Sequence, residues 1–267
     1  MKLKHENIIY SLGITLMLTY GCVKTESSVS INGWDGKTPF GYQINSYLST
    51  NWEGDNLTLF ITNENKTVVF RSISGGEPNI EIPDCFICDS YKGSSVGLND
   101  SFQKSIVLCP SHVGNTQLHI SNLQYDEIMR IVILPEFYTF SEPSLDFDDT
   151  QDSVTRKLSS LHYTEAGGIY SIPDPHNDYS LTIDYSASGM VDSYEVSLGN
   201  TVDSEELTGF ISERYFKTSA YYNGMPVFIK AFNIKSPSIS DATFVVMLDI
   251  EGRKIKYQNP LTYSRQL

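Results

Sequence analysis

Basic residues are scarce in this chain of 267 residues. Lysine and arginine together number 19 against 32 aspartates and glutamates, which gives a net charge of −13. Phosphate binding needs clustered lysine and arginine, so this balance argues against nucleic acids and anionic membrane surfaces as partners. The simplest reading of the acidity is that it keeps an exposed protein soluble.

Common catalytic motifs are scarce as well. The chain has no H-E-x-x-H, no P-loop and no G-x-G-x-x-G pattern, so the metalloprotease, nucleotide and dinucleotide signatures are missing. Asp174–Asp178 places His176 between carboxylates, which suits acid–base work. A loop rich in turn-forming residues has this composition for structural reasons too. Glycosidase-type carboxylate pairs need no local motif, because the two residues meet only in the fold. We expect no cofactor and a non-catalytic protein.

The chain also lacks an apolar run long enough to span a membrane. Ile8–Gly21 is an apolar run of fourteen residues, below the roughly 17 to 25 that a spanning helix needs. Lys2 and Lys4 form a basic head before it, and Cys22 follows it. This layout is typical of an export signal, so we predict that residues 1–21 direct the chain out of the cytoplasm.

The end of this run resembles a bacterial lipobox, where lipoproteins are cleaved before a cysteine and acylated on it. In Leu18–Cys22, Thr19 stands where that family prefers leucine, and leucine lies one step further out. This looser form is similar to the lipoboxes of Bacteroidetes-type surface lipoproteins. The resemblance implies acylation of Cys22 and a lipid anchor in the cell envelope, at the outer membrane, facing the periplasm or the cell surface. A secretory signal cut without acylation is the alternative.

Aromatic residues, in contrast, are plentiful. The chain has 17 tyrosines and 13 phenylalanines beside 2 tryptophans, and β-strands favour such residues. Short segments that either alternate apolar and polar residues or form short apolar runs predict strands. These segments are 56–61, 67–73, 105–108, 116–120, 128–134, 181–185 and 194–198. Because Gly, Asn and Pro separate them, we predict an all-β protein with two β-sandwich-like domains.

Turn signals and one helical pattern refine this picture. Asn223-Gly224 supplies the two positive-φ positions of a tight hairpin, and Glu251-Gly252 marks a second hairpin. Apolar residues at i, i+4 and i+7 predict a short helix near 153–164. Residues 207–215 fit a helix as well as a strand. Gly209 within them, and the hairpin beyond, make us favour a strand.

The composition divides the exported chain into three parts. Residues 22–40 are polar and read as a flexible tether; 41–136 form the first domain and 137–267 the second. In the first domain, Cys109–Ile120 followed by Ile131–Ile133 resembles the closing strands of a bacterial immunoglobulin-like domain. That resemblance implies an antiparallel sandwich used as a spacer or an adhesive module, and it brings no catalytic residues.

Three cysteines and a histidine have the spacing of a structural zinc site: Cys85, Cys88, Cys109 and His112. In an exported chain, disulfides are the more usual outcome. We predict one disulfide from Cys85 or Cys88 to Cys109, with one thiol left over. Zinc and free thiols are the alternatives.

Two further groups of residues are candidates for ligand binding. The first is an acidic cluster that suits Ca²⁺, which takes six to eight oxygen ligands, although a solvated acidic linker has the same composition: Asp146, Asp148, Asp149 and Asp152. The second is a set of aromatic residues that suits sugar stacking, although most aromatics of a sandwich lie in its core: Trp34, Trp52, Tyr221 and Tyr222.

We therefore predict a lipid-anchored cell-envelope protein that binds a glycan or a surface protein without catalysis. An exported glycoside hydrolase that uses carboxylates of the second domain is one alternative. A structural subunit of a surface assembly is the other, and a long unpaired edge strand would favour it.

Overall fold

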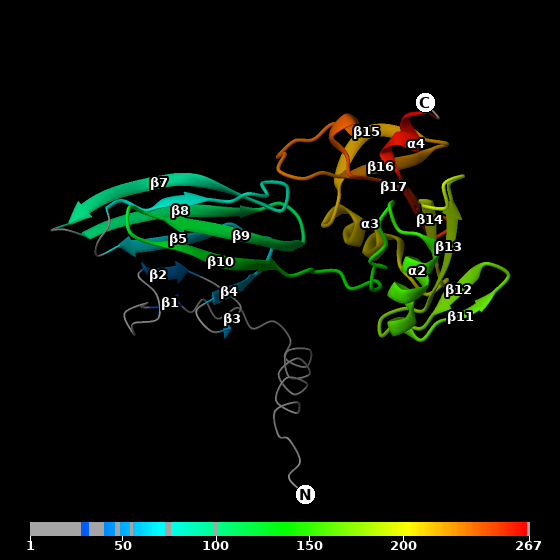
Figure 1. Cartoon of the computed structure of the whole chain (residues 1–267), viewed down its shortest axis with the longest axis horizontal. Helices are drawn as coiled ribbons and strands as arrows, with labels where there is room; N and C mark the ends of the chain where they lie inside the picture. The colour runs from blue at the N-terminus through cyan, green and yellow to red at the C-terminus, as the bar shows by residue number, and fades with distance from the viewer. Residues whose placement is uncertain are drawn as a thin grey trace, which may run out of the picture.

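The computed structural model describes residues 28–31, 40–45, 49–53, 56–72, 76–98 and 101–265. The predicted export signal, Cys22 and Trp34 lie outside these residues. The described chain is all-β, as predicted, and its strands form two modules placed one after the other along the longest axis (Figure 1). We call residues 28–133 the first module and 151–265 the second. Residues 134–150, which join them, are the connecting segment.

The first module is a sandwich of two five-stranded sheets. One sheet has the strand order β1-β2-β5-β8-β7 and the other has the order β3-β4-β10-β9-β6. The bounds of the strands are β1 Ser28–Ile31, β2 Phe40–Asn45, β3 Ser49–Glu53, β4 Asn56–Ile61, β5 Lys66–Ser72, β6 Asn79–Glu81, β7 Cys88–Leu98, β8 Ser101–Pro110, β9 Gly114–Ser121 and β10 Asp126–Ile133. All pairs are antiparallel except β4 and β10, which run parallel.

The core of the sandwich follows the predicted alternation. Leu59 and Ile61 of β4 face inward from one sheet, and Val68 and Phe70 of β5 face them from the other. On β9, the buried residues are every second one: Thr116, Leu118 and Ile120. Period-2 burial of this kind fixes the register, because a one-residue slip would turn each apolar side chain to solvent.

The predicted tether is wrong in part. β1 lies within residues 22–40, and it pairs with β2 as an edge strand of the first sheet. Ser28–Ile31 alternates polar and β-branched residues, so this piece is suited to a sheet edge. The first module therefore begins before residue 41.

The second module contains a single eight-stranded antiparallel sheet with the order β11-β12-β13-β14-β18-β17-β16-β15. The bounds of the strands are β11 Thr164–Ala166, β12 Ile169–Ile172, β13 Tyr179–Tyr185, β14 Val191–Leu198, β15 Phe216–Tyr222, β16 Met225–Lys230, β17 Phe244–Asp249 and β18 Lys254–Gln258. Helices α2 (Gln151–Leu158), α3 (Ser204–Ser212) and α4 (Pro260–Ser264) supply further core residues, with the 3-10 turns η2 (Ser159–Leu161) and η3 (Ile239–Asp241). In the described part of the chain, every helix is too short or too polar to cross a membrane.

Both predicted hairpins are confirmed. Asn223 and Gly224 connect β15 to β16 with φ angles of 49° and 82°, which are the positive values that a tight primed turn requires. β17 and β18 pair on either side of residues 250–253. There, the positive φ angle falls on Arg253, at 52°.

The short helix predicted near 153–164 is confirmed as α2 and η2. Thr150 caps α2, because its hydroxyl accepts a hydrogen bond from the main-chain N–H of Ser153. Val154 and Leu158 are buried on one face of the helix. His162 ends η2 with a left-handed φ of 53°.

The strand favoured for residues 207–215 is wrong, because this segment begins with helix α3. Leu207, Phe210 and Ile211 are buried at the i, i+3 and i+4 spacing of one helix face. Gly209, which argued against a helix, is required by packing. A Cβ at this position would lie 2.5 Å from the ring of Phe137, closer than any real contact, so glycine lets the connecting segment touch the helix.

Candidate functional site: the joint between the modules and its neighbouring cleft

The connecting segment contributes buried residues to a core although it forms no strand. Phe140 and Leu145 are 3% and 2% exposed and belong to the main core cluster of the second module. The Phe140 ring lies 4.8 Å from the ring of Phe210 on α3, centroid to centroid. A segment with this much buried apolar surface is part of the second module, because releasing it would expose that surface to water.

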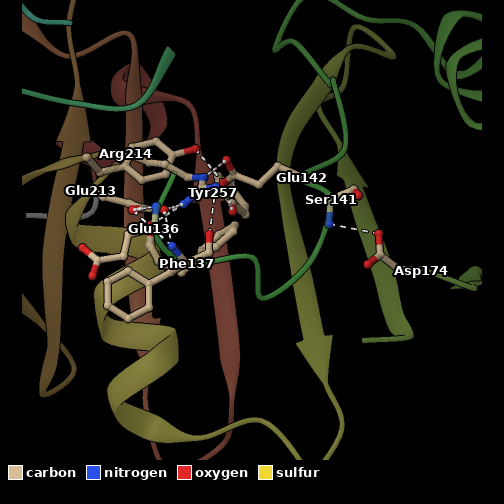
Figure 2. Close-up of polar contacts among 10 residues, drawn as sticks. Glu136, Phe137, Ser141, Glu142, Asp174, Glu213, Arg214 and Tyr257 are labelled. Carbon is tan, nitrogen blue, oxygen red and sulfur yellow. Dashed lines mark hydrogen bonds and ion pairs between the residues drawn. The ribbon is translucent and has the colours of Figure 1, made fainter. Parts of the chain in front are cut away.

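Glu142 is the polar anchor of this segment. Its Oε1 accepts hydrogen bonds from the hydroxyls of Tyr215 at 2.9 Å and Tyr257 at 2.5 Å, and Figure 2 shows the carboxylate among these partners. Its Oε2 lies 3.5 Å from Nε of Arg214. Burial, and then the Glu142 charge, raise the pKa of both tyrosines well above the ordinary value. Both hydroxyls therefore remain protonated donors at neutral pH.

The end of helix α3 holds the start of the same segment. The Glu213 carboxylate accepts hydrogen bonds from the main-chain N–H groups of Glu136, at 2.9 Å, and Phe137, at 3.4 Å (Figure 2). The Arg214 guanidinium pairs with Glu213, donates to the Phe137 carbonyl at 3.3 Å and lies 3.7 Å from the centre of the Phe210 ring. A planar guanidinium is suited to this combination of ion pairing and stacking.

Direct contacts then join the first module to the second. The main-chain N–H of Val113 donates to the Glu213 carbonyl at 2.7 Å. The main-chain N–H of Asn233 donates to the Asp84 carboxylate at 3.3 Å. Ala231, which follows β16, is 4% exposed and belongs to the core cluster of the sandwich.

An ion pair extends this interface. Lys235 donates to the Asp89 carboxylate at 2.6 Å and to the Tyr91 hydroxyl at 3.3 Å, and its ammonium lies 4.8 Å from the centre of the Tyr91 ring. Burial acts to raise the pKa of Asp89, but the hydrogen bond from Lys235 outweighs it and holds this pKa below the ordinary value. The joint thus combines main-chain, apolar and charged contacts.

His112 lies in this interface and not in a metal site. Its ring stacks on Phe86 at 4.1 Å with an angle of 4° between the planes, and Nδ1 lies 2.8 Å from the Phe86 carbonyl. Burial lowers its pKa, although main-chain hydrogen bonds at Phe86 and Tyr215 act in the opposite direction. His112, which the sequence offered as a zinc ligand, therefore packs in the joint between the modules.

The strand register bears on one of the two predicted disulfides, that from Cys88 to Cys109, and the one from Cys85 to Cys109 stays a prediction. Cys85, Cys88 and Cys109 are all free thiols in the structure. Cys88 pairs with Pro110, while Cys109 pairs with Asp89 on the neighbouring strand. Residues directly opposite in a ladder share a face and successive residues alternate, so Cys88 and Cys109 point to opposite faces of the sheet. A bond from Cys88 to Cys109 would have to cross the sheet.

The zinc and calcium sites that the sequence left open as alternatives do not assemble in the structure. In the ranges that the structure describes, no group of three or more His, Cys, Asp or Glu side chains is placed to hold a metal ion. The Asp149 carboxylate instead accepts three hydrogen bonds from α2 and from its own loop. The donors are the Lys157 ammonium, the Ser153 hydroxyl and the main-chain N–H of Asp146, each at 2.7 Å. Burial acts to raise its pKa, but these hydrogen bonds, that from Lys157 first, hold the pKa below the ordinary value.

Beside the acidic cluster is an open cleft of about 520 Å³. The connecting segment, the loop before β17 and the start of α4 form its walls. Its lining residues are Asp146, Phe147, Asp148, Ser240, Ala242, Thr243, Phe244, Asn259, Pro260 and Leu261. The sequence prediction placed carboxylates here but missed the cleft, because its other walls come from residues about 100 positions later in the chain.

The aromatic set predicted for sugar stacking is not brought together as one platform. Tyr221 is 64% exposed on edge strand β15. Tyr222 packs inward, with its ring 5.9 Å from that of Tyr263. Trp34 and the side chain of Trp52 lie outside the described residues.

Two sequence patterns have structural roles. In the loop 174–178, Asp174 accepts hydrogen bonds from the main-chain N–H groups of Ser141 at 3.0 Å (Figure 2) and His176 at 2.9 Å, so its carboxylate fixes the loop against the connecting segment. Gly93–Gly97 matches G-x-S-x-G, but these residues lie inside strand β7, where Ser95–Gly97 pair with β8. A nucleophile elbow needs a sharp turn from strand to helix, so this match is no catalytic site.

Comparison with known proteins gives no family. No protein-family model matches the chain, and no curated protein matches it. Among solved structures, domains 5–6 of the S-layer protein SbsC align at a TM-score of 0.25 and 9% identity, over 88% of this chain and 85% of that one. Domains 4–9 of the same protein align at 0.23 and 8%, over 82% of this chain and 34% of that one. Similarity this low carries no argument about function.

Proposed function

We propose that the chain is a lipid-anchored protein of the cell envelope, attached through Cys22 at the outer membrane. Its two β-modules act as one stiff arm that binds a surface partner without catalysis. The proposal combines the lipobox-like Leu18–Cys22 with the joint, and the joint is the observation that carries it. The resemblance to immunoglobulin-like modules, which act as spacers and adhesive units, agrees with it.

A stiff arm follows from how the joint is built. A flexible linker would leave the modules independent, as is usual for small polar interfaces. Here the connecting segment is buried in the second module through Phe140 and Leu145, while Ala231 of the second module lies in the core of the first. Relative movement of the modules would therefore expose apolar surface and break the Val113–Glu213 hydrogen bond.

The chemistry of the joint favours a mechanical role over catalysis. The Glu142 carboxylate is surrounded by protein partners, two tyrosines and an arginine. A general acid or base needs a carboxylate that can reach a substrate. These contacts instead hold Glu142 to the sheet and to α3.

Two measurements test the proposal. Mass spectrometry of the membrane fraction should find a diacyl or triacyl group on Cys22, and Cys22→Ser should release the protein from the membrane. Distances between spin labels, one at Asp126 and one at Glu251, should show a single narrow distribution. Both positions are exposed and lie in different modules. An unmodified Cys22 refutes the anchor, and a broad distance distribution refutes the stiff arm.

A second candidate function, a structural subunit that assembles by strand addition, rests on β7. This strand of 11 residues is at the edge of its sheet, where unpaired main-chain groups can accept another strand. Its register shifts between Lys92 and Ser95, and such a bulge is a common protection of edges. Sedimentation at rising protein concentration separates the two candidate functions, because strand addition requires oligomers. Replacing exposed Val96 with proline should disrupt these oligomers.

A further inference from the structure

The cleft of the second module has a one-sided charge. Asp146 and Asp148 contribute carboxylates to its wall, and no lysine, arginine or histidine is among the residues that line it. Asp146 is partly neutralised, because its Oδ2 lies 2.8 Å from the Lys157 ammonium. Asp148 is exposed and, among the described residues, makes no hydrogen bond or ion pair. The cleft therefore has one carboxylate whose charge is not compensated.

Apolar surface lies next to this carboxylate. The rings of Phe147 and Phe244 are packed with centroids 4.7 Å apart, and both contribute to the lining. Leu261 at the start of α4 also lines the cleft and is 69% exposed. An aromatic and aliphatic wall beside a free carboxylate matches a side chain with an apolar stem and a cationic end.

We propose that this cleft binds an arginine or lysine side chain of a protein partner, which would make it the binding surface of the arm proposed above. The cleft is wide open to solvent and has a volume of about 520 Å³, so it can admit a side chain that remains attached to a larger partner. Arginine fits best, because its planar guanidinium both pairs with a carboxylate and stacks on rings. The cationic end pairs with Asp148, and the stem lies along Phe147 and Leu261.

Charge complementarity favours this occupant over the alternatives. A neutral sugar gains hydrogen bonds from its hydroxyl groups to a carboxylate, whereas a basic side chain gains an ion pair as well as hydrogen bonds. A calcium ion takes six to eight oxygen ligands, and within the described ranges no group of three acidic side chains converges. The net charge of −13 acts in the same direction, because it attracts basic partners over distance.

The test uses the full-length chain in detergent and two fluorescent pentapeptides that are identical except at two positions. One is acetyl-Gly-Arg-Phe-Arg-Gly-amide, and the other has glutamate in place of both arginines. Fluorescence anisotropy measures binding at low and at high salt. We expect the arginine peptide to bind and the glutamate peptide not to bind, with affinity falling as salt screens the ion pair.

Asp148→Asn should weaken binding of the arginine peptide roughly two- to fivefold, the range expected for one exposed ion pair. Glu251→Gln is the matched control, because it removes the same charge from an exposed residue at the opposite end of β17, and it should leave the affinity unchanged. Asp148→Lys should reverse the preference in favour of the glutamate peptide. None of the three variants alters a buried contact, so all three are expected to fold.

Equal affinity of the wild type and Asp148→Asn for the arginine peptide overturns the proposal. Saturable binding of neutral oligosaccharides that displaces the arginine peptide also overturns it, and assigns the cleft to glycans. Neither result affects the anchor or the stiff arm, which are measured separately by acylation of Cys22 and by inter-module distances.

Discussion

Replacing Glu142 should loosen the connecting segment more than any other single polar change in the joint. Glu142→Leu fills a similar volume but removes the acceptor of two buried hydroxyls, those of Tyr215 and Tyr257. These residues are 7% and 1% exposed, so water cannot easily replace the lost partner. Arg214 keeps its contacts with Glu213 and with two main-chain carbonyls, and it therefore adds little to the loss.

The expected magnitude follows from these contacts. Each buried polar group left without a partner costs about 1–3 kcal/mol, so Glu142→Leu should lower the free energy of unfolding by roughly 2–6 kcal/mol. Glu142→Gln keeps an acceptor oxygen but loses the charge. Hydrogen bonds to charged groups exceed neutral ones by about 1 kcal/mol each, which predicts a loss of about 2 kcal/mol. Since each kcal/mol shifts Tm by about 2–4 °C for a protein of this size, both changes are measurable.

Urea unfolding followed by circular dichroism measures the effect, with Glu195→Gln as control. Glu195 pairs with Lys254 at 2.8 Å on the surface, and such exposed pairs contribute about 0–1 kcal/mol. The order of stability should be wild type, then Glu195→Gln, Glu142→Gln and Glu142→Leu. If Glu142→Leu unfolds at the same urea concentration as Glu195→Gln, the carboxylate is not the anchor of the connecting segment.

Three further predictions concern the rest of the fold. Burial lowers the pKa of His112 below its usual 6.5, so the unfolded chain takes up this proton at a higher pH than the folded chain. The stability contributed by neutral His112 is present above about pH 6.5 and is lost as pH falls towards the lowered value. His112→Gln should flatten the urea midpoint plotted between pH 7 and 5, and an unchanged slope refutes this role. Gly209→Ala should destabilise the protein by about 1–3 kcal/mol, because its Cβ overlaps the Phe137 ring; Gly209→Ala with Phe137→Leu should recover part of the loss, and no recovery contradicts the overlap. Burial, as the largest cause, raises the pKa of Cys88 to about 12. A thiol reagent at pH 8 should therefore modify the other two described cysteines and spare Cys88. Rapid modification of Cys88 in the folded protein would contradict its burial.

The sequence predicted the sandwich well, because its strands carry their own signal. β4 and β9 alternate inward and outward residues, and the Asn223-Gly224 turn needs no tertiary contact to form. The helix α3 was mispredicted since Gly209 lowers helix propensity. Glycine is needed at this position because the Phe137 ring lies against it, and Phe137 comes from a different part of the chain.

The joint and the cleft were beyond sequence reasoning for the same physical reason. Glu142 meets Tyr215 and Tyr257 across separations of 73 and 115 residues, and no local period records such contacts. The acidic cluster was visible, but its spacing did not show that Lys157 neutralises Asp146 and Asp149. The C-x2-C and C-x2-H spacing suggested four ligands, but the sheet places two of them, Cys88 and Cys109, on opposite faces.

The anchor and the cleft are parts of one segment, and this links stability of the joint to binding. Glu142 holds the segment to the sheet, and Asp146 and Asp148, four and six residues further on, form a wall of the cleft. A carboxylate that is held in place loses less freedom on binding than a mobile one. Glu142→Gln should therefore weaken binding of the arginine peptide although Glu142 does not line the cleft. The variant must be measured at a temperature where it stays folded. An affinity equal to that of the wild type would show that Lys157 and helix α2 position the cleft wall without the anchor.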